Sequence, residues 1–198
     1  MTVIWGERTT LRPVSPADLD LLAGWLTDPE VYRWWGGKPL PRAEVERQFI
    51  EHDPDTEPFI VEARGPGEVS GTPVGYLQYW LGDEGPHADT AGPTGVDATT
   101  DAASDPDADP DLDTARPTGG IDMFLIPSAR EQGLGSDAAR AMVRYLLDVL
   151  KWRRVTADPA VDNARAIRAW EKAGFVFERD WPDHPDEPAV LLSINAEP

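Results

Sequence analysis

The segment at residues 130–135, REQGLG, has the residue types and the spacing of an anion-binding loop. It lies between a predicted strand at residues 121–125 and a predicted helix at residues 135–150. Glycines at such a junction let several backbone N–H groups point into one concavity, and the helix N-terminus adds about half a positive charge. The loop is therefore suited to a pyrophosphate group. The same glycines are also compatible with a tight turn that binds nothing, and this segment alone does not decide between the two interpretations.

Two common nucleotide-binding motifs do not fit this segment. A P-loop requires the pattern GxxxxGK[ST], which is absent from the chain. A dinucleotide-binding fold requires GxGxxG inside a parallel unit, with an acidic residue about 20 positions further on. Only Gly-x-Gly is present here. Neither class of nucleotide site is therefore expected.

A second motif follows at residues 162–175, DNARAIRAWEKAGF, and matches the pattern N-x-x-A-x-x-x-aromatic-E-K-x-G-F. With R-x-x-G-x-G upstream, in this order and separation, it resembles the GNAT superfamily of acetyl-CoA-dependent N-acetyltransferases. The resemblance covers nearly the whole chain. Within the superfamily the chain is similar to aminoglycoside 6′-N-acetyltransferases, with matches at residues 34–37 (WWGG), 73–78 (PVGYLQ), 120–125 (GIDMFL), 156–159 (TADP) and 185–190 (PDEPAV).

The resemblance implies that acetyl-CoA is the co-substrate. Backbone groups of Met123, Phe124 and Leu125 would pair with the pantetheine arm as an added strand does. Asn163 would hydrogen-bond the pantetheine amide, and Trp170 would also lie at the cofactor. The pyrophosphate would be held by Arg130, Gln132, Gly133, Leu134, Gly135 and Ser136.

The resemblance also implies that Asp122 is the acid at the reacting amine. A carboxylate beside an ammonium raises the pKa of the amine, which opposes its deprotonation. Asp122 must therefore accept the proton during attack, directly or through water. Read alone, Asp122 is also compatible with an ordinary carboxylate at a strand end.

The resemblance implies an aminoglycoside as the acceptor, which is a rigid polycation. Its pocket should therefore present carboxylates for the amines and flat aromatics for the sugar rings. The residues expected on this side are Trp34, Trp35, Gln78, Asp158 and Asp186. Other interpretations stay open, since the two tryptophans are compatible with the core and Asp158, followed by proline, with a turn. The alternative functions are acetylation of another amine, such as a siderophore precursor or a protein N-terminus, and a non-catalytic acyl-CoA-binding module.

Trp170 departs from the pattern of many GNAT enzymes, which carry a tyrosine here whose phenol can protonate the departing thiolate. An indole is a donor only and does not ionise usefully. Either the thiolate leaves unprotonated, or water or another group supplies the proton.

The composition narrows the class of partner. The 198 residues include 36 acidic and 18 basic side chains, for a net charge of −18, so binding to nucleic acid is not expected. No apolar run approaches the ~20 residues that span a bilayer, and the N-terminus lacks a signal pattern, so we expect no membrane association and a cytoplasmic protein. Cysteine is absent, which excludes disulfides and thiol chemistry. We expect a monomer or a weak dimer.

An acidic segment at residues 83–119 carries ten acidic side chains and one arginine, a net charge of −9. It contains few apolar residues and is therefore expected to be an irregular loop inserted into one domain that covers residues 1–198. Its alternating aspartates at 105–113 lack the central Gly and distal Glu of a calcium loop, so no metal is expected. His52, His87 and His184 lie in polar surroundings and are expected to be solvated rather than ligands.

The order of the predicted elements indicates a mixed α/β or α+β sheet covered by helices. The resemblance makes this a GNAT fold, with a mostly antiparallel central sheet, a V-shaped splay and helices on both faces. Hydrophobic periodicity and capping residues predict helices after Ser15 and at residues 28–34, 42–51, 135–150 and 163–173. Strands are predicted at residues 9–14, 58–63, 74–81, 121–125, 154–157, 175–181 and 190–194.

Overall fold

The structure is a computed structural model that describes residues 2–65, 71–82, 116–184 and 187–197. In this part of the chain eight strands form one sheet, in the order β1-β2-β3-β4-β5-β6-β8-β7. Neighbouring strands are antiparallel except β5 and β6, which are parallel. The strands are β1 (Ile4–Trp5), β2 (Thr9–Pro13), β3 (Thr56–Ala63), β4 (Thr72–Leu81), β5 (Thr118–Leu125), β6 (Arg154–Ala157), β7 (Val176–Trp181) and β8 (Ala189–Asn195).

The parallel pair β5 and β6 separates after only three residue pairs. The last of these joins Gly120 to Thr156, whereas β5 continues beside β4 as far as Leu125. Within the described ranges, residues 121–125 of β5 therefore have a ladder partner on the β4 side alone. A strand with one open edge can accept an extended ligand as an additional strand. The predicted V-shaped splay is confirmed.

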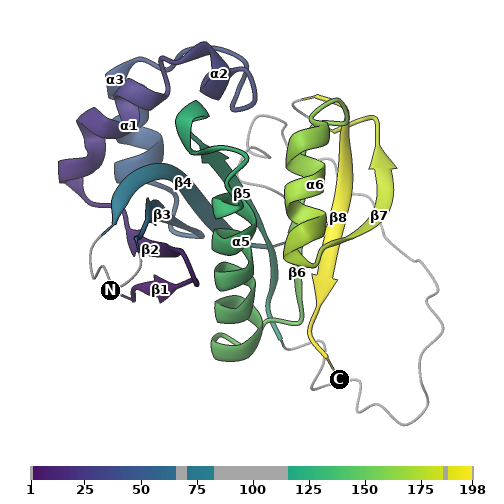
Figure 1. Cartoon of the computed structure of the whole chain (residues 1–198). Helices are drawn as coiled ribbons and strands as arrows, with labels where there is room; N and C mark the ends of the chain where they lie inside the picture. Colours follow the sequence, from purple (N-terminus) through teal and green to yellow (C-terminus); the bar gives the residue numbers. More distant parts are fainter. Residues whose placement is uncertain (1, 66–70, 83–115, 185–186, 198) are drawn as a thin grey trace, which may run out of the picture.

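Helices cover both faces of the sheet (Figure 1). One face carries a short turn η1 (Pro16–Asp18), α1 (Leu19–Trp25), α2 (Pro29–Tyr32), and α3 (Arg42–Val45) with its continuation η2 (Glu46–Ile50). The other carries α5 (Leu134–Arg144), its continuation η5 (Tyr145–Val149), and α6 (Ala164–Ala173). The turn η4 (Pro127–Ala129) joins β5 to the loop before α5. None of the described helices is long and apolar enough to cross a membrane.

Successive residues of the central strands contribute to opposite layers of the core. On β4, Tyr76 packs with α1–α3, and Leu77 packs with α5 and α6. On β5, Phe124 packs in the layer of α1–α3, and Ile121 packs in the layer of α5 and α6. This alternation follows from the two-residue period of a strand. It also fixes which residues of β5 face each layer.

Gly120 is required where the sheet begins to splay. A Cβ atom at this position would lie 2.1 Å from the ring of Trp80, which is buried against it. A larger residue would push the tryptophan away from the sheet. The close approach therefore depends on glycine.

Three local predictions differ from the structure. The strand β1 was not predicted, and the helix expected at residues 28–34 ends at Tyr32, so that Trp34 lies in the following turn. β5 begins at Thr118, inside the segment expected to be irregular, because residues 118–120 pair with β6. The rest of that segment, residues 83–115, lies outside the described residues together with His87 and the aspartates at 105–113.

Candidate active site

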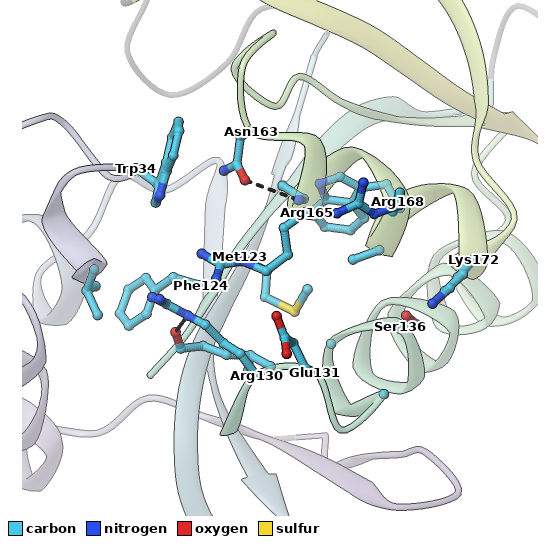
Figure 2. Close-up of a pocket in the computed structure, with 17 residues that line it drawn as sticks. Trp34, Met123, Phe124, Arg130, Glu131, Ser136, Asn163, Arg165, Arg168 and Lys172 are labelled. Atoms are coloured by element: carbon cyan, nitrogen blue, oxygen red, sulfur yellow. Dashed lines mark hydrogen bonds between the residues drawn. The ribbon is translucent and has the colours of Figure 1, made fainter. Parts of the chain in front are cut away.

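A cavity of about 410 Å³ opens at the splay, between α2, the end of β5, the loop before α5, and α6 (Figure 2). The sequence-predicted residues that line it are Trp34, Met123, Phe124, Leu125, Arg130, Gly133, Gly135, Ser136, Asn163 and Trp170. The open edge of β5 therefore forms part of the wall of the cavity. We call this cavity the splay pocket.

The loop at the floor of the splay pocket has the backbone conformation of a tight strand–helix connection. Gly133 has a φ of 78° and occupies the N-cap position of α5, a conformation that favours glycine. The buried side chain of Ser136 lies in the first turn of the helix. A helix N-terminus facing a cavity is a favourable place for an anion.

Two predicted loop residues face away from the splay pocket. Leu134 is buried in the core, and the side chain of Gln132 donates a hydrogen bond to the carbonyl oxygen of Ser128. The carbonyl oxygen of Gln132 accepts a hydrogen bond of 2.6 Å from Arg8. Gln132 can therefore bind a ligand in the pocket only through its backbone, or after its side chain moves.

Asp137, in the first turn of α5, connects the loop to the N-terminal part of the sheet. Its carboxylate accepts hydrogen bonds from the Thr9 hydroxyl (2.7 Å) and from the backbone N–H groups of Glu7 and Arg8. Burial acts to raise the pKa of Asp137, but these hydrogen bonds outweigh it and the pKa is lowered. Asp137 is thus held in its charged form and ties the anion loop to β1 and β2.

Cationic side chains surround the splay pocket. Arg165, Arg168 and Lys172 line it from α6, in addition to Arg130 from the loop. Burial lowers the pKa of Arg130, and the positive charge of Arg165 lowers it further. The three α6 residues were not predicted from the sequence, although their spacing of three and four positions places them on one helix face. This concentration of positive charge suits a polyanionic ligand.

The guanidinium group of Arg130 is directed mainly at the protein. It donates to the carbonyl oxygen of Leu125 at 2.9 Å, and to the carboxylate and backbone carbonyl of Glu30 at 3.0 and 2.8 Å. Glu30 belongs to α2, and Val31 beside it lines the splay pocket. Arg130 therefore fastens α2 to the end of β5 and adds positive charge to the pocket.

Asp122 lies on β5 next to the splay pocket and opposite Gln78 on β4. The buried side chain of Gln78 accepts a hydrogen bond of 2.7 Å from the hydroxyl of Tyr76. Burial raises the pKa of Tyr76 well above its usual range, and the negative charge of Asp122 contributes. Tyr76 therefore stays protonated and donates to Gln78, while Asp122 provides the negative charge at this position.

The two adjacent tryptophans have different surroundings. Trp34 lines the splay pocket, and the guanidinium of Arg33 lies 4.7 Å from the centre of its ring. Trp35 packs edge-on against Tyr76 and Phe124, at 5.5 and 5.1 Å between ring centres. Trp35 therefore belongs to the aromatic layer that supports β4 and β5.

The remaining predicted residues lie around α6 and the end of β6. The side chain of Asn163 accepts a hydrogen bond from the backbone N–H of Ala166 and caps α6. Trp170 is buried against Phe175, with ring centres 5.3 Å apart. Asp158 follows β6, and Asp186 lies outside the described residues.

His184 was expected to be solvated, and this prediction is wrong. Its Nε2 atom lies 2.9 Å from Oδ2 of Asp158, and only 13% of its side chain is exposed. The contact joins residues 26 positions apart, so the local composition around His184 gave no signal for it. His52 contacts the carbonyl oxygen of its neighbour Asp53. In the described part of the chain, no three histidine, aspartate or glutamate side chains form a metal-binding group.

A splayed sheet with an open strand edge, beside a cationic, glycine-containing loop at a helix N-terminus, can hold an extended ligand that carries phosphates. Comparison with known families identifies the class of protein. Residues 15–182 match the family described as "Acetyltransferase (GNAT) domain", and the chain belongs to this family.

The relatives include aminoglycoside-modifying enzymes. Aminoglycoside N(6′)-acetyltransferase type 1 from Klebsiella pneumoniae is 29% identical over 193 residues, which cover 94% of this chain and 82% of that enzyme. The structure of AAC(6′)-Ib with paromomycin and acetyl-CoA matches with a TM-score of 0.70 and 28% identity, covering 96% of this chain and 94% of the other. The same enzyme with coenzyme A and kanamycin matches with a TM-score of 0.68 and 27% identity, covering 94% of each chain.

Proposed function

We propose that this protein transfers the acetyl group of acetyl-CoA to a primary amine of an aminoglycoside, at the 6′ position. The observation that carries the proposal is the position of two carboxylates at the splay. Asp122 follows the last β5–β6 pair by two residues on β5, and Asp158 follows it by two residues on the chain leaving β6. An acceptor with several amines can be held between two such carboxylates, beside the cationic splay pocket.

The splay pocket fits acetyl-CoA, which would supply an activated acetyl group and a thiolate leaving group. The loop at Gly133 and Ser136 and the cations of α6 would hold the phosphates, because both present positive charge to the pocket. The open edge of β5 from Met123 to Leu125 would accept the pantetheine arm through backbone hydrogen bonds. Asn163, on the facing wall, would hydrogen-bond an amide of that arm.

Asp122 is the proposed general base. The acceptor arrives as an ammonium, which Asp122 attracts, and the nitrogen becomes nucleophilic only after it loses a proton. Asp122 accepts this proton, directly or through water, as the nitrogen attacks the thioester carbonyl carbon. Gln78 occupies the paired position on β4 and is itself fixed by Tyr76, so we assign it to the acceptor side with Asp122.

The remaining acceptor residues follow from their positions. Trp34 would offer a flat ring at the pocket wall, and Trp35 would act through the aromatic layer behind it. Asp158 and Asp186 would bind further amines of the acceptor, as their match to the aminoglycoside 6′-N-acetyltransferases implies. Trp170 lines the pocket from α6 and packs against Phe175, but it provides no ionisable proton for the thiolate. Solvent water therefore supplies that proton in our proposal.

The proposal is tested by thiol release from acetyl-CoA in the presence of a panel of amines. The panel contains kanamycin, spermidine, a hydroxylamine and a short peptide with a free N-terminus. We expect release with kanamycin, with the acetyl group on the 6′ nitrogen by NMR of the product. The matched control Asp122→Asn keeps the size of the side chain and removes the base.

Two results would replace the proposal with one of its alternatives. Release with the peptide or the hydroxylamine but not with kanamycin would assign the protein to another amine. Binding of acetyl-CoA without release for any amine would indicate a non-catalytic acyl-CoA-binding module.

A further inference from the structure

Three residues beside β7 and the end of β6 form a compact group, of which the proposed function uses only Asp158. Nε2 of His184 contacts Oδ2 of Asp158 at 2.9 Å, and the exposed fractions of the two side chains are 13% and 16%. The ring of Trp181 packs edge-on against the imidazole, with ring centres 4.7 Å apart. We call Asp158, Trp181 and His184 the C-terminal cluster.

The C-terminal cluster lies on the same side of the sheet as Asp122. Thr156 pairs with Gly120 on β5, and the chain beyond β6 keeps its register with β8, since Ala160 bridges Ala189 and Ala157 pairs with Leu192. Side chains alternate along an extended chain, so Asp158 shares the side of Thr156, and Asp122 shares the side of Gly120. They stand on the two arms of the splay, with the opening between them.

A small cavity adjoins the C-terminal cluster. It has a volume of about 190 Å³ and is lined by Thr156 and Arg154 of β6, Glu178, Arg179 and Trp181 of β7, and Leu191 of β8. Trp181 therefore contacts both this cavity and the imidazole of His184. The guanidinium of Arg179 covers the ring of Trp181 at 4.6 Å, which restrains the ring further.

The contact with His184 restricts how the Asp158 carboxylate can turn. A hydrogen bond to one oxygen limits rotation of the carboxylate, and the imidazole that makes it packs against Trp181. A carboxylate ordered before binding pays less side-chain entropy when a cation arrives. The arrangement also leaves the second carboxylate oxygen with its own lone pairs for a ligand.

We propose that His184 is a positioning residue that sets acceptor selectivity. It holds Asp158 ready for a second amine of the acceptor while the reacting amine is at Asp122. This inference rests on the proposed function, since it assumes an acceptor with several amines. It predicts that His184 affects the KM for polyamine acceptors and has little effect on kcat, because His184 acts through Asp158, which would hold an amine other than the reacting one.

The test compares kanamycin with the monoamine glucosamine in the full-length protein carrying His184→Ala or His184→Gln. Loss of a hydrogen bond to a charged group predicts a rise of about tenfold in the KM for kanamycin in His184→Ala. His184→Gln restores a donor and is expected to recover about half of that effect on a logarithmic scale. The KM for glucosamine is expected to stay within about twofold, because one amine engages Asp122 alone. His52→Gln is the matched control, since His52 contacts only its neighbour's carbonyl among the described contacts.

A double-mutant cycle separates positioning from a general structural effect. In an Asp158→Asn background, His184→Ala is expected to add little to the KM for kanamycin, because the group it positions has lost its charge. Equal changes for both acceptors, or a fall in kcat with both KM values unchanged, would overturn the inference.

The proposed function can fail separately from this inference. If the wild-type protein turns over neither kanamycin nor glucosamine, the proposed function is refuted. Calorimetric titration of kanamycin into the wild type and His184→Ala then decides the inference, and equal dissociation constants would overturn it.

Discussion

The cations of α6 provide the sharpest quantitative test of the splay pocket, and Arg165 is the residue to change. Its charge reaches far enough to lower the pKa of Arg130 across the pocket, so it acts on the space where the phosphates are expected. At roughly 8 Å, with an effective dielectric constant of about 40, one pair of charges is worth about 1 kcal/mol. Arg165→Gln should therefore raise the KM for acetyl-CoA about fivefold at low salt and leave kcat unchanged.

The matched control is Arg144→Gln, which removes the same charge from the exposed C-terminal end of α5, outside the pocket lining. Thiol-release kinetics at two salt concentrations measure both variants. Screening beyond about 8 Å at physiological salt should reduce the Arg165 effect towards twofold in higher salt. Equal KM values for the two variants, or an effect of Arg165→Gln that is independent of salt, would refute the assignment of the phosphates to this side of the pocket.

Substitutions at two further residues test the site and its support. Trp170→Phe should keep kcat within about threefold, because it keeps an aromatic ring against Phe175 and removes no acidic proton donor; a large gain in kcat for Trp170→Tyr would instead show that protonation of the thiolate limits the rate. Asp137 has a lowered pKa in the folded protein, so its contribution to stability is present above its unfolded pKa of ~3.9 and is lost as the pH falls through the lower folded value. Asp137→Asn should therefore lower the Tm at pH 7, and the gap to the wild type should narrow below about pH 4; a gap that is constant with pH, measured by thermal unfolding, would contradict the role given to that carboxylate.

Local signals in the sequence predicted the parts of the fold that local contacts determine. The helix expected from Asn163 begins with that residue as its cap and ends at Gly174, whose φ of 108° favours glycine. The loop before α5 was predicted from its glycines, and the splay was predicted from the resemblance that those motifs carry. Strand β1 was missed because two residues are too few to show a periodicity.

The features that the sequence did not predict depend on tertiary contacts. Asp137 reaches Glu7, Arg8 and Thr9 across about 130 positions of the chain. His184, which follows β7, meets Asp158, which follows β6, because β8 pairs with both of these strands. The spacing of Arg165, Arg168 and Lys172 is visible in the sequence, but their importance depends on which face of α6 lines the pocket. Such pairings require the fold before they can be recognised.

The most direct test of the proposed reaction is the identity and rate of formation of the product made from kanamycin and acetyl-CoA by the wild type and by Asp122→Asn. We expect 6′-N-acetylkanamycin from the wild type, and a fall in kcat of at least about 100-fold in the variant, in the range expected for loss of a general base. The KM for acetyl-CoA should change little, because the phosphate-binding loop and the α6 cations remain in place. Turnover at the wild-type rate by Asp122→Asn would remove Asp122 from the mechanism, and acetylation of kanamycin at another nitrogen would refute the proposed 6′ position.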